Sequence, residues 1–331
     1  MKNKYTIGIT DYISPPADIE QKAFPEAAFV FLDDWRASQD SRRCWAAADG
    51  LLVWHWPVDR QTVEVMEKCK IVVRYGTGYD LVDLGALAEK KIPLCNTPDY
   101  GTEEVADAAC GMILSLNRKL FEYDAACRGF TDSWQENTFE DQLRTSHRTV
   151  GIIGVGRIGT AVVNRLKPFG FAIIGYDPYK PSGHEKAVGY ERIDSLEELL
   201  SRSDIVSVHC PLTGETRGMI DDGFFKQMKP GSSLVNTARG RILAGLDCLE
   251  QALKSGRLAS AATDVLPDEP PKPHPLMEAW RKNEKWLRGR LLVTPHTAWY
   301  SRQAWCEMRR KAAETARMYL LDGRLRNRIT G

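Results

Sequence analysis

The segment Gly154-Val155-Gly156-Arg157-Ile158-Gly159 constrains the fold of this chain more than any other part of the sequence. It follows the strand-like run 148–154 and opens a helical stretch at 158–167. Glycines at this spacing permit a tight turn, close approach of a pyrophosphate to the backbone, and close packing of helix on strand. The helix N-terminus adds unpaired N–H groups and a partial positive charge. The segment therefore predicts a dinucleotide-binding βαβ unit rather than an incidental glycine turn.

A carboxylate at the end of the next strand bears on which dinucleotide this loop would bind. Asp177 follows the run 172–176, about twenty residues after the glycines. A carboxylate there can accept hydrogen bonds from both ribose hydroxyls and would repel a 2′-phosphate. We therefore expect NAD(H), with NADP(H) less favoured, although Lys180 lies close enough in sequence to weaken the preference. The predicted cofactor contacts in this region are Gly154, Gly156, Arg157, Ile158, Gly159 and Asp177.

Two series of short strands alternate with helical stretches. The first series comprises 5–10, 27–32, 50–54 and 71–75, and the second comprises 148–154, 172–176, 205–209, 233–236, 260–264 and 290–294. This alternation indicates parallel sheets covered by helices. A long helical stretch at 103–128 predicts a crossing between two domains, and a last one at 301–321 predicts a return. We expect an outer domain of 1–101 with 300–331 and a nucleotide-binding domain of 102–299.

Composition excludes several other classes of protein. Lys plus Arg is 45 and Asp plus Glu is 44, and this balance argues against a protein whose main task is to bind nucleic acid. The eight cysteines have neither a C-x-x-C pair nor zinc spacing, which predicts free thiols in a reducing compartment and no metal site. The N-terminus lacks a signal-peptide pattern, and no apolar run approaches the roughly 18 residues of a membrane span. We expect a soluble, cytoplasmic protein with no membrane partner.

Three ionisable residues follow successive strands of the second series. Arg239 follows 233–236, Glu269 lies in the loop after 260–264, and His296 follows 290–294. Ligands of open α/β sheets bind outside the carboxyl ends of the strands, so these loops should converge beside the cofactor. A histidine can give a proton to a carbonyl oxygen while hydride reaches the neighbouring carbon, and a carboxylate keeps that histidine oriented and protonated. An arginine fork can hold a substrate carboxylate. The set predicts reversible reduction of a 2-oxo acid, with His296 as acid/base, Glu269 as its partner and Arg239 as the clamp.

The sequence resembles the D-isomer-specific 2-hydroxyacid dehydrogenase family over nearly its whole length. The segments that carry this resemblance are 208–213, 236–240, 264–270 and 295–296. Segments 74–80, 176–179 and 296–301 are most similar to the C-terminal-binding protein branch. The resemblance implies two doubly wound parallel-sheet domains, a Rossmann-type NAD domain inserted in a flavodoxin-like substrate domain. It also implies a cleft that closes on substrate, and a homodimer.

The resemblance implies further contacts. It implies that the cofactor is contacted by Thr77, His209, Pro211, Thr237, Ala238 and Asp264. Asp264 would lie near the nicotinamide amide. The resemblance implies that the substrate is contacted by Arg74, Tyr75, Gly76, Trp54, His55 and Trp299. The loop 74–78 would offer backbone N–H groups to the substrate carboxylate, Gly76 would allow close approach, and Trp299 would line the pocket for the substrate's side chain.

The identity of the substrate stays open. Trp54, Trp56 and Trp299 would suit a bulky apolar acid, whereas Arg74 with Arg239 would suit an acid with two anionic groups. The Trp54-His55-Trp56 run is unusual for the family, and domain packing explains it as well as substrate contact does. The Pro-rich and then charged stretch 267–289 is longer than in the corepressor members and predicts a surface excursion.

A second class of function fits many of the same residues. The chain could be an NAD(H)-sensing corepressor or scaffold resembling the C-terminal-binding proteins, which keep the catalytic residues. Those proteins carry extensions beyond the dehydrogenase core, and their lack here favours an enzyme. A third option is a phosphoglycerate, phosphite or formate dehydrogenase of the same fold. Formate ranks lowest because it has no substituent to fill a Trp-lined pocket.

Overall fold

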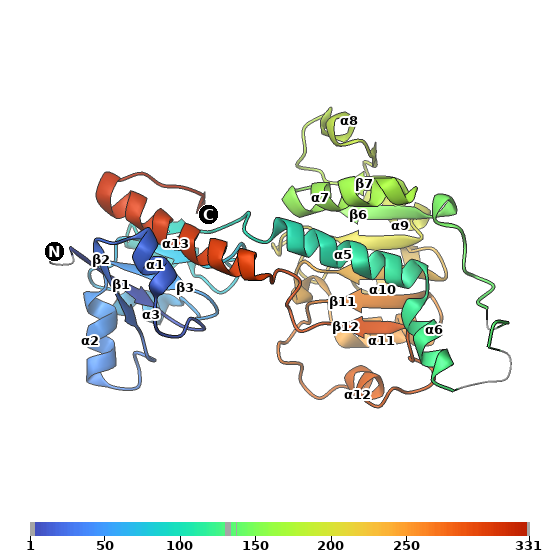
Figure 1. Cartoon of the computed structure of the whole chain (residues 1–331), viewed down its shortest axis with the longest axis horizontal. Helices are drawn as coiled ribbons and strands as arrows, with labels where there is room; N and C mark the ends of the chain where they lie inside the picture. The colour runs from blue at the N-terminus through green and yellow to red at the C-terminus, as the bar shows by residue number, and fades with distance from the viewer. Residues whose placement is uncertain (1–3, 130–133, 137, 330–331) are drawn as a thin grey trace. The chain divides into compact units, whose positions relative to one another are not determined.

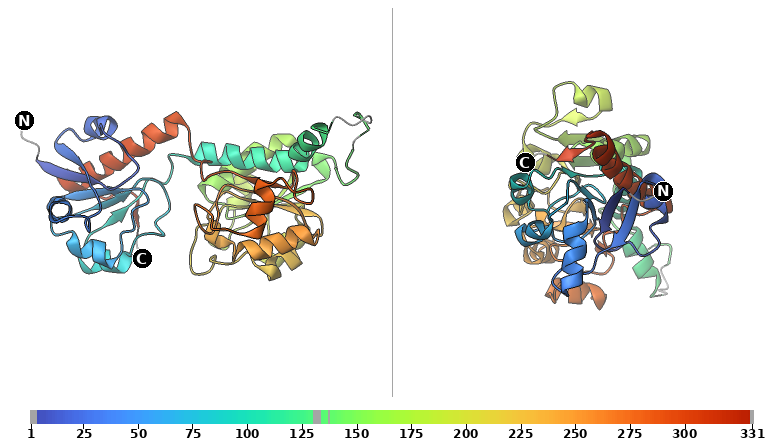
Figure 2. Two further views of the ribbon diagram at one scale, coloured as in Figure 1. Left: turned by 90° about the horizontal axis from the view of Figure 1, so that it is seen from below. Right: turned by 90° about the vertical axis from the view of Figure 1, so that its left-hand side faces the viewer.

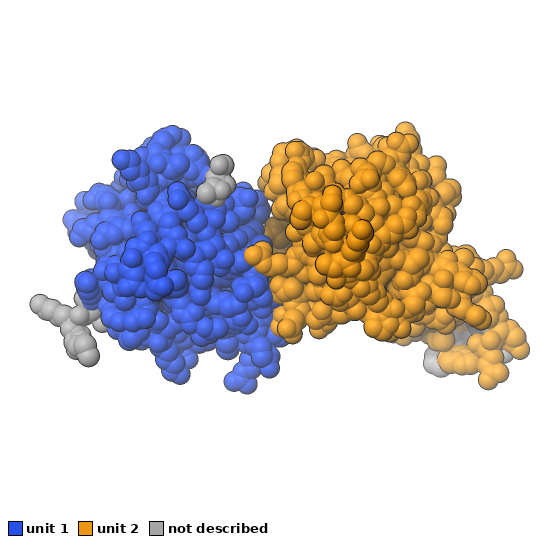
Figure 3. Space-filling view, turned by 90° about the horizontal axis from the view of Figure 1, so that it is seen from above, with its two compact units in different colours: residues 1–101, 300–331 blue, residues 102–299 orange. Residues whose placement is uncertain are grey.

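The structure is a computed structural model that describes residues 4–129, 134–136 and 138–329. The chain forms two compact units, Met1–Gly101 with Tyr300–Gly331 and Thr102–Trp299 (Figure 3). Each unit has its own sheet with helices packed around it (Figures 1 and 2). The fold class predicted from the sequence, an α/β chain with two parallel-sheet domains, is confirmed.

The sheet of the first unit has the strand order β13-β5-β4-β3-β1-β2. All its neighbouring strands are parallel except β13, which pairs antiparallel with β5. The order 2-1-3-4-5 is the flavodoxin-like one that was expected. The strands are β1 Tyr5–Ile9, β2 Ala27–Phe31, β3 Gly50–Val53, β4 Val72–Arg74, β5 Leu94–Cys95 and β13 Arg328–Ile329. The helices are α1 Asp18–Ala23, α2 Gln39–Ala47, α3 Arg60–Val65, α4 Leu84–Glu89 and α13 Arg302–Asp322.

A buried charge network holds the returning helix α13 in the first unit, where it packs against α1 and β4. Glu20 on α1 is fully buried and accepts two hydrogen bonds from the Arg309 guanidinium on α13, at 2.8 and 2.6 Å. The Tyr75 hydroxyl donates a third, at 2.9 Å. A buried carboxylate is tolerated only with such partners, so these bonds fix both helices to the end of β4.

The sheet of the second unit has the order β12-β11-β10-β9-β6-β7-β8, and every described pair is parallel. This is the doubly wound order 3-2-1-4-5-6 with one strand added at the edge. The strands are β6 Thr149–Ile153, β7 Ala172–Tyr176, β8 Glu191–Arg192, β9 Ile205–Val208, β10 Ser232–Asn236, β11 Leu258–Thr263 and β12 Leu291–Val293. The helices are α5 Thr102–Asn117, α6 Leu120–Cys127, α7 Arg157–Leu166, α8 His184–Val188, α9 Leu196–Arg202, α10 Asp222–Gln227, α11 Leu246–Lys254 and α12 Pro275–Arg281.

Both faces of this sheet are buried, which explains why its strands are almost continuously apolar. One cluster packs α5 and α7 on the sheet and includes Ile113, Val162 and Ile152, each fully buried. A second cluster covers the sheet with residues of α9, α10 and α11, among them Leu199 and Leu253. The left view of Figure 2 shows helices on both sides of this sheet.

Several elements differ in extent from the sequence prediction. The helix expected at 103–128 is two helices, α5 and α6, because Lys119 adopts a left-handed conformation with φ of 52°. The short strands β5, β8 and β13 were not predicted, since two residues are too few to show a period. The excursion 267–289 contains helix α12.

No described helix is both long enough and apolar enough to cross a membrane. The longest described helix, α13, has 21 residues and carries charged side chains along its length.

Candidate active site

The register of the second sheet brings the ends of six strands to one edge. Ile153 pairs with both Tyr176 and Val208. Asn236 pairs with Val208 and with Thr263, and Thr263 pairs with Val293. The residues that follow these positions are the predicted ones: Gly154, Asp177, His209, Thr237, Asp264 and the loop with His296. Parallel pairing therefore places the predicted cofactor and catalytic residues of this unit along a single edge.

The three glycines of the loop at Gly154–Gly159 are required for different reasons. Gly154 has φ of 88°, and a Cβ on it would lie 2.6 Å from the backbone N of Cys210. A Cβ on Gly159 would lie 2.1 Å from the carbonyl oxygen of Gly154. A Cβ on Gly156 would meet no described protein atom within 4 Å. The fold itself thus explains the first and third glycines, and the second fits a ligand that approaches the N-terminus of α7.

Asp177 follows β7 and its carboxylate hydrogen-bonds to the glycine loop. Its carboxylate accepts a hydrogen bond from the backbone N–H of Val155 at 2.9 Å and another from that of Tyr179 at 3.1 Å. The side chain is half-buried, so it keeps one flank toward solvent beside the loop. Arg157 and Ile158 form the first turn of α7, where Arg157 is exposed.

Two buried polar atoms at this edge have no hydrogen-bond partner among the described atoms. They are Nδ1 of His209 and Oγ1 of Thr237. His209 shares a 2.9 Å hydrogen bond with Ser207 through Nε2, and burial lowers the pKa of His209 to about 4, so the ring is neutral. Buried polar groups without partners are rare in folded proteins, so these atoms fit a site that receives a polar ligand. The residues present therefore suit a dinucleotide.

His296 and Glu269 form a hydrogen-bonded pair. Nδ1 of His296 lies 2.7 Å from Oε2 of Glu269, and Oε1 of Glu269 accepts the backbone N–H of Leu266 at 2.8 Å. Burial by itself would raise the pKa of Glu269, but the hydrogen bond and charge of His296, the Leu266 N–H and the charge of Arg239 together lower it below 4.5. Glu269 is therefore ionised at neutral pH and accepts from the Nδ1–H of His296. This tautomer leaves Nε2 of His296 for proton transfer.

Asp264 holds the loop that carries His296. It is 2% exposed, and its carboxylate accepts the Thr294 hydroxyl at 2.6 Å and the backbone N–H groups of Thr297 and Ala298 at 3.0 and 2.9 Å. The backbone N–H of His296 donates to the Asp264 carbonyl at 2.8 Å. These bonds hold His296 at φ of 54°, a left-handed conformation that a histidine seldom adopts. Sequence reasoning assigned Asp264 to the cofactor and missed this clamp, because it depends on the path of the loop.

Arg239 leaves β10 through a turn held by Asn236. The Asn236 side chain accepts the backbone N–H of Ala238 at 3.0 Å and donates to the carbonyl of Arg239 at 3.1 Å. Nη1 of Arg239 donates to the Ala238 carbonyl at 2.8 Å. The turn that follows Arg239 packs on the loop that carries Glu269, because a Cβ on Gly240 would lie 1.8 Å from the carbonyl oxygen of Leu266. The predicted catalytic three are thus brought together in one unit.

The predicted substrate residues of the first unit follow β3 and β4. The Arg74 guanidinium lies 5.1 Å from the ring centre of Trp54, and a Cβ on Gly76 would lie 2.4 Å from Nη1 of Arg74. Glycine at position 76 therefore makes room for Arg74. The Gly76 N–H donates to Oγ1 of Thr97 at 2.6 Å, so it is engaged within the fold rather than presented to a ligand. The Tyr75 side chain is fully buried against Glu20.

The remaining predicted residues vary in exposure. Trp54 is 4% exposed, His55 is exposed, and Trp56 packs on Trp45 with ring centres 5.3 Å apart. Packing inside the first unit therefore accounts for Trp56. In the second unit, Trp299 is 9% exposed and donates from Nε1 to the His296 carbonyl at 2.9 Å. Thr77 and Pro211 are exposed and Ala238 is half-buried.

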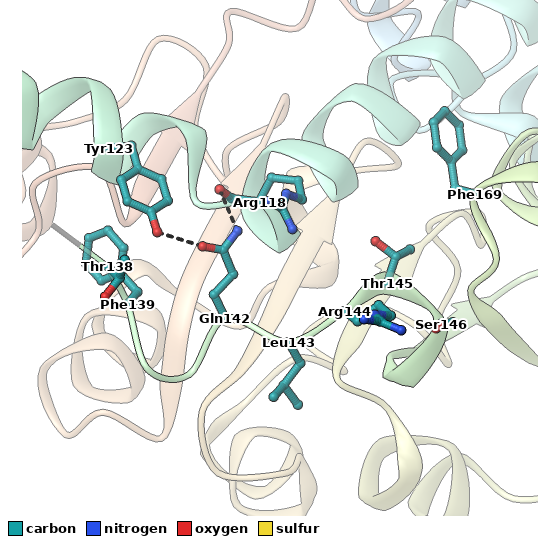
Figure 4. Close-up of a pocket in the computed structure, with 10 residues that line it drawn as sticks. All are labelled: Arg118, Tyr123, Thr138, Phe139, Gln142, Leu143, Arg144, Thr145, Ser146 and Phe169. Carbon is teal, nitrogen blue, oxygen red and sulfur yellow. Dashed lines mark hydrogen bonds between the residues drawn. The ribbon is translucent and has the colours of Figure 1, made fainter. Parts of the chain in front are cut away.

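A cavity of about 570 Å³ in the second unit lies away from this edge. Its lining includes Arg118, Tyr123, Gln142 and Thr145, and Gln142 joins the Tyr123 hydroxyl to the Arg118 carbonyl (Figure 4). The lining segment 142–146 leads into the amino end of β6, whereas the glycine loop follows its carboxyl end. The cavity is therefore separate from the candidate active site.

One group of metal-ligating residue types occurs among the described residues: Asp247, Glu250 and His274. Both ring nitrogens of His274 are engaged. Nδ1 accepts the backbone N–H of Leu276 at 3.1 Å, which caps α12, and Nε2 lies 3.0 Å from Asp247. These bonds anchor the excursion 267–289 to α11 and account for the group without an ion.

Known proteins resemble this chain in sequence. Residues 110–298 match the family model described as D-isomer specific 2-hydroxyacid dehydrogenase, NAD binding domain. The D-3-phosphoglycerate dehydrogenase of Methanocaldococcus jannaschii is 38% identical over 220 residues, covering 66% of this chain and 41% of that protein. C-terminal-binding protein 1 of Caenorhabditis elegans is 32% identical over 325 residues, covering 94% of this chain and 43% of that protein. The chain thus spans less than half the length of these two relatives.

Solved structures share the fold. The D-lactate dehydrogenase from Aquifex aeolicus, complexed with NAD and lactic acid, has a TM-score of 0.83 at 24% identity and covers 98% of this chain and 99% of its own. The resemblance found in the sequence is confirmed by the family model, which matches more than half of the chain. The chain belongs to the D-isomer-specific 2-hydroxyacid dehydrogenase family.

Proposed function

We propose that this chain is an NAD-dependent oxidoreductase that transfers hydride between NAD(H) and a D-2-hydroxy acid or its 2-oxo acid. The observation that carries the proposal is the 2.7 Å pair of His296 and Glu269, on the same sheet edge as the glycine loop. Family membership and the names of the relatives support an enzyme acting on a hydroxy acid.

His296 supplies the proton. In the direction of reduction, its protonated ring would donate from Nε2 to the carbonyl oxygen of the 2-oxo acid, and NADH held at the glycine loop would supply hydride to the carbonyl carbon. In the reverse direction, neutral Nε2 accepts the hydroxyl proton of the 2-hydroxy acid. Glu269 accepts from Nδ1–H in both directions and stabilises the charged ring. The balance is 2-oxo acid plus NADH plus H⁺ giving 2-hydroxy acid plus NAD⁺.

Arg239 orients the substrate. A guanidinium can bind a carboxylate through two parallel N–H bonds, and its charge polarises the neighbouring carbonyl. The close approach of Gly240 to Leu266 supports a position of Arg239 near the loop of Glu269. Asp264 acts through His296 by holding its loop, and is a positioning residue in this scheme.

We also propose that NAD(H) is preferred to NADP(H). The Asp177 carboxylate, held beside the glycine loop by the Val155 N–H, would repel a 2′-phosphate. Loss of this charge is therefore expected to narrow the preference for NAD(H) over NADP(H).

The cell context and assembly are part of the same proposal. All eight cysteines are free thiols, which suits the reducing cytoplasm. The partner is a small acid rather than nucleic acid or membrane. We propose a homodimer formed through the exposed apolar side chains Leu120 and Phe121 of α6 and Leu143. Leu120→Glu should convert the dimer to a monomer in light scattering, and a monomeric parent protein would refute the proposal.

A corepressor or scaffold remains the second candidate function. The observation in its favour is the similarity to C-terminal-binding protein 1 over 94% of this chain. Such a protein would bind NADH at the same glycine loop, so cofactor binding cannot distinguish the two functions. Turnover can.

The test is oxidation of NADH by the purified protein with a panel of 2-oxo acids. Glyoxylate, hydroxypyruvate, phenylpyruvate and 2-oxoglutarate would each be assayed with NADH and with NADPH. We expect turnover on one class, and we expect His296→Ala to abolish it while NADH still binds, as followed by the fluorescence of the cofactor. Tight NADH binding without turnover of any acid would favour the scaffold, and a His296→Ala variant with unchanged kcat would refute the role of His296.

A further inference from the structure

Gly240, directly after Arg239, makes room for a second backbone segment. A Cβ on Gly240 would lie 1.8 Å from the carbonyl oxygen of Leu266 and 2.0 Å from its carbonyl carbon. Both atoms belong to the backbone, so no side chain can turn aside to make room. Close approach of another backbone segment is one reason why a fold requires glycine. A larger residue at position 240 must therefore displace one of the two segments.

The turn that contains Gly240 is anchored before and after that residue. The Asn236 side chain donates to the Arg239 carbonyl at 3.1 Å, and the Gly240 carbonyl accepts the backbone N–H of Leu243 at 3.0 Å. Ile242 is fully buried and Leu243 is 7% exposed, and both belong to the cluster formed with α9, α10 and α11. Movement of this turn would disturb a packed core, so the turn is the fixed side of the contact.

The loop that carries Leu266 becomes exposed beyond that residue. Its start is fixed, because the Thr263 hydroxyl donates to the Val265 carbonyl at 2.6 Å. Val265 and Leu266 are buried, whereas Glu269 is exposed. Exposed segments move at a lower cost in free energy than packed ones, so the loop rather than the turn would give way.

Glu269 would follow a movement of Leu266. One carboxylate oxygen of Glu269 accepts the backbone N–H of Leu266 at 2.8 Å, and the other lies 2.7 Å from Nδ1 of His296. The same carboxylate thus joins the segment that touches Gly240 to the acid/base histidine. Hydrogen bonds weaken steeply outside their preferred geometry, so a shift of about 1 Å at Leu266 would break one of the two.

Arg241 makes a second contact between the turn and the loop. Its Nε donates to the carbonyl of Pro267 at 3.3 Å, and the residue is exposed. The contacts of Gly240 and Arg241 fall on successive residues of the loop, Leu266 and Pro267. Two adjacent contacts fix both the position and the direction of the segment that leads to Glu269.

We propose that the turn at Gly240 is a positioning device that holds Glu269 against His296. The inference rests on the proposed function. Gly240 and Arg241 act through Glu269, and are therefore positioning residues rather than catalytic ones. Because the turn itself stays in place when the loop moves, Arg239 keeps its position. Loss of the close approach should slow the chemical step and leave the binding of the cofactor and the acid unchanged.

The test measures kcat and KM for the best 2-oxo acid of the panel in Gly240→Ala, in Glu269→Ala and in the double variant. We expect Gly240→Ala to lower kcat roughly 10- to 100-fold, with unchanged KM for the acid and unchanged affinity for NADH. In the Glu269→Ala background the same substitution should have little further effect, because the residue through which it acts is absent. An equal loss of kcat in both backgrounds would overturn the inference and make Gly240 a purely structural residue.

Gly245→Ala is the matched control. Gly245 follows the same turn, has φ of −179°, and a Cβ on it would meet no described protein atom within 4 Å. The substitution should leave kcat, KM and the urea unfolding curve as in the parent protein. A loss of kcat in this variant equal to that in Gly240→Ala would overturn the inference.

If Gly240→Ala does not fold, as judged by urea unfolding, Arg241→Ala takes its place. This variant removes one hydrogen bond of an exposed residue, and it should lower kcat about threefold in the parent background but not in the Glu269→Ala background. Unchanged kcat in the parent background would overturn the inference.

Failure of the inference can be distinguished from failure of the proposed function. Turnover of an acid by the parent protein, together with full kcat in Gly240→Ala or a rise in KM for the acid alone, would overturn the inference only. Absence of turnover on every acid by the parent protein would overturn both.

Discussion

Asp264→Asn tests how His296 is held in place. In the parent protein one carboxylate oxygen of Asp264 accepts from Thr294 and Thr297, and the other accepts from Ala298. An amide has only one acceptor oxygen, so at least one of these donors faces an NH₂ group and stays unsatisfied in a buried site. Losing one hydrogen bond to a charged group costs about 1.5–3 kcal/mol, and the two that remain weaken without the charge. Removing a buried charge offsets part of this loss, so we expect the free energy of unfolding to fall by about 2–3 kcal/mol.

The same change should also slow turnover. The loop that carries His296 loses its clamp, and a displacement of about 1 Å at a catalytic group can cost on the order of 100-fold in rate. Urea unfolding would give the stability, and NADH oxidation with the best acid of the panel would give kcat. Asp268→Asn is the control, because Asp268 lies in the same loop but pairs only with the exposed Lys272 among the described residues. If Asp264→Asn matched Asp268→Asn in both stability and kcat, the clamp would have no role.

Three further outcomes follow from the geometry. Gly156→Ala should weaken NADH binding and leave the free energy of unfolding unchanged. Gly159→Ala should lower the free energy of unfolding, because its Cβ would lie 2.1 Å from the carbonyl oxygen of Gly154. Equal stabilities of the two variants in urea unfolding would contradict this difference. The pKa of His209 falls from 6.5 when unfolded to about 4 when folded, so the unfolded chain binds more protons between these values. Stability should therefore drop by up to about 3 kcal/mol as the pH falls from 6.5 to 4, and urea titrations of His209→Gln should lack this component. Asp177→Ala should reduce the ratio of kcat/KM for NADH to that for NADPH, and an unaltered ratio would remove Asp177 from cofactor selection.

The glycine loop is a part of the structure that its local sequence pattern predicts. Its glycine spacing, the preceding strand and the following helix specify a tight strand–turn–helix unit through backbone sterics alone. The prediction from the sequence and the structure agree there because the positive φ of Gly154 and the contact of Gly159 with Gly154 are local, although the close approach of Cys210 to Gly154 comes from a distant strand. By contrast, local sequence does not predict the two-residue strands β5, β8 and β13, because only pairing with a neighbouring strand defines them.

The helix break at Lys119 has a similar origin. The apolar pattern of 103–128 continues through this position, so periodicity predicts one helix. In the structure Lys119 pairs with Glu122 at 3.2 Å and with Asp141 at 3.0 Å while its backbone turns left-handed. The contact with Asp141 comes from a distant segment, and a local pattern cannot reveal it.

By itself, the sequence determined the fold class, the glycine loop and the residues that follow the six strands of the active-site edge. These depend on backbone geometry and on the alternation of apolar runs, which any short window of sequence displays. Only the tertiary structure decided what each side chain meets: Glu269 meets His296, Asp264 meets the loop of His296, and Arg241 meets the loop of Glu269. Those contacts join residues tens of positions apart, because parallel strands bring the ends of separate segments to one edge. Their distances are set by strand register and loop path, which no local pattern records.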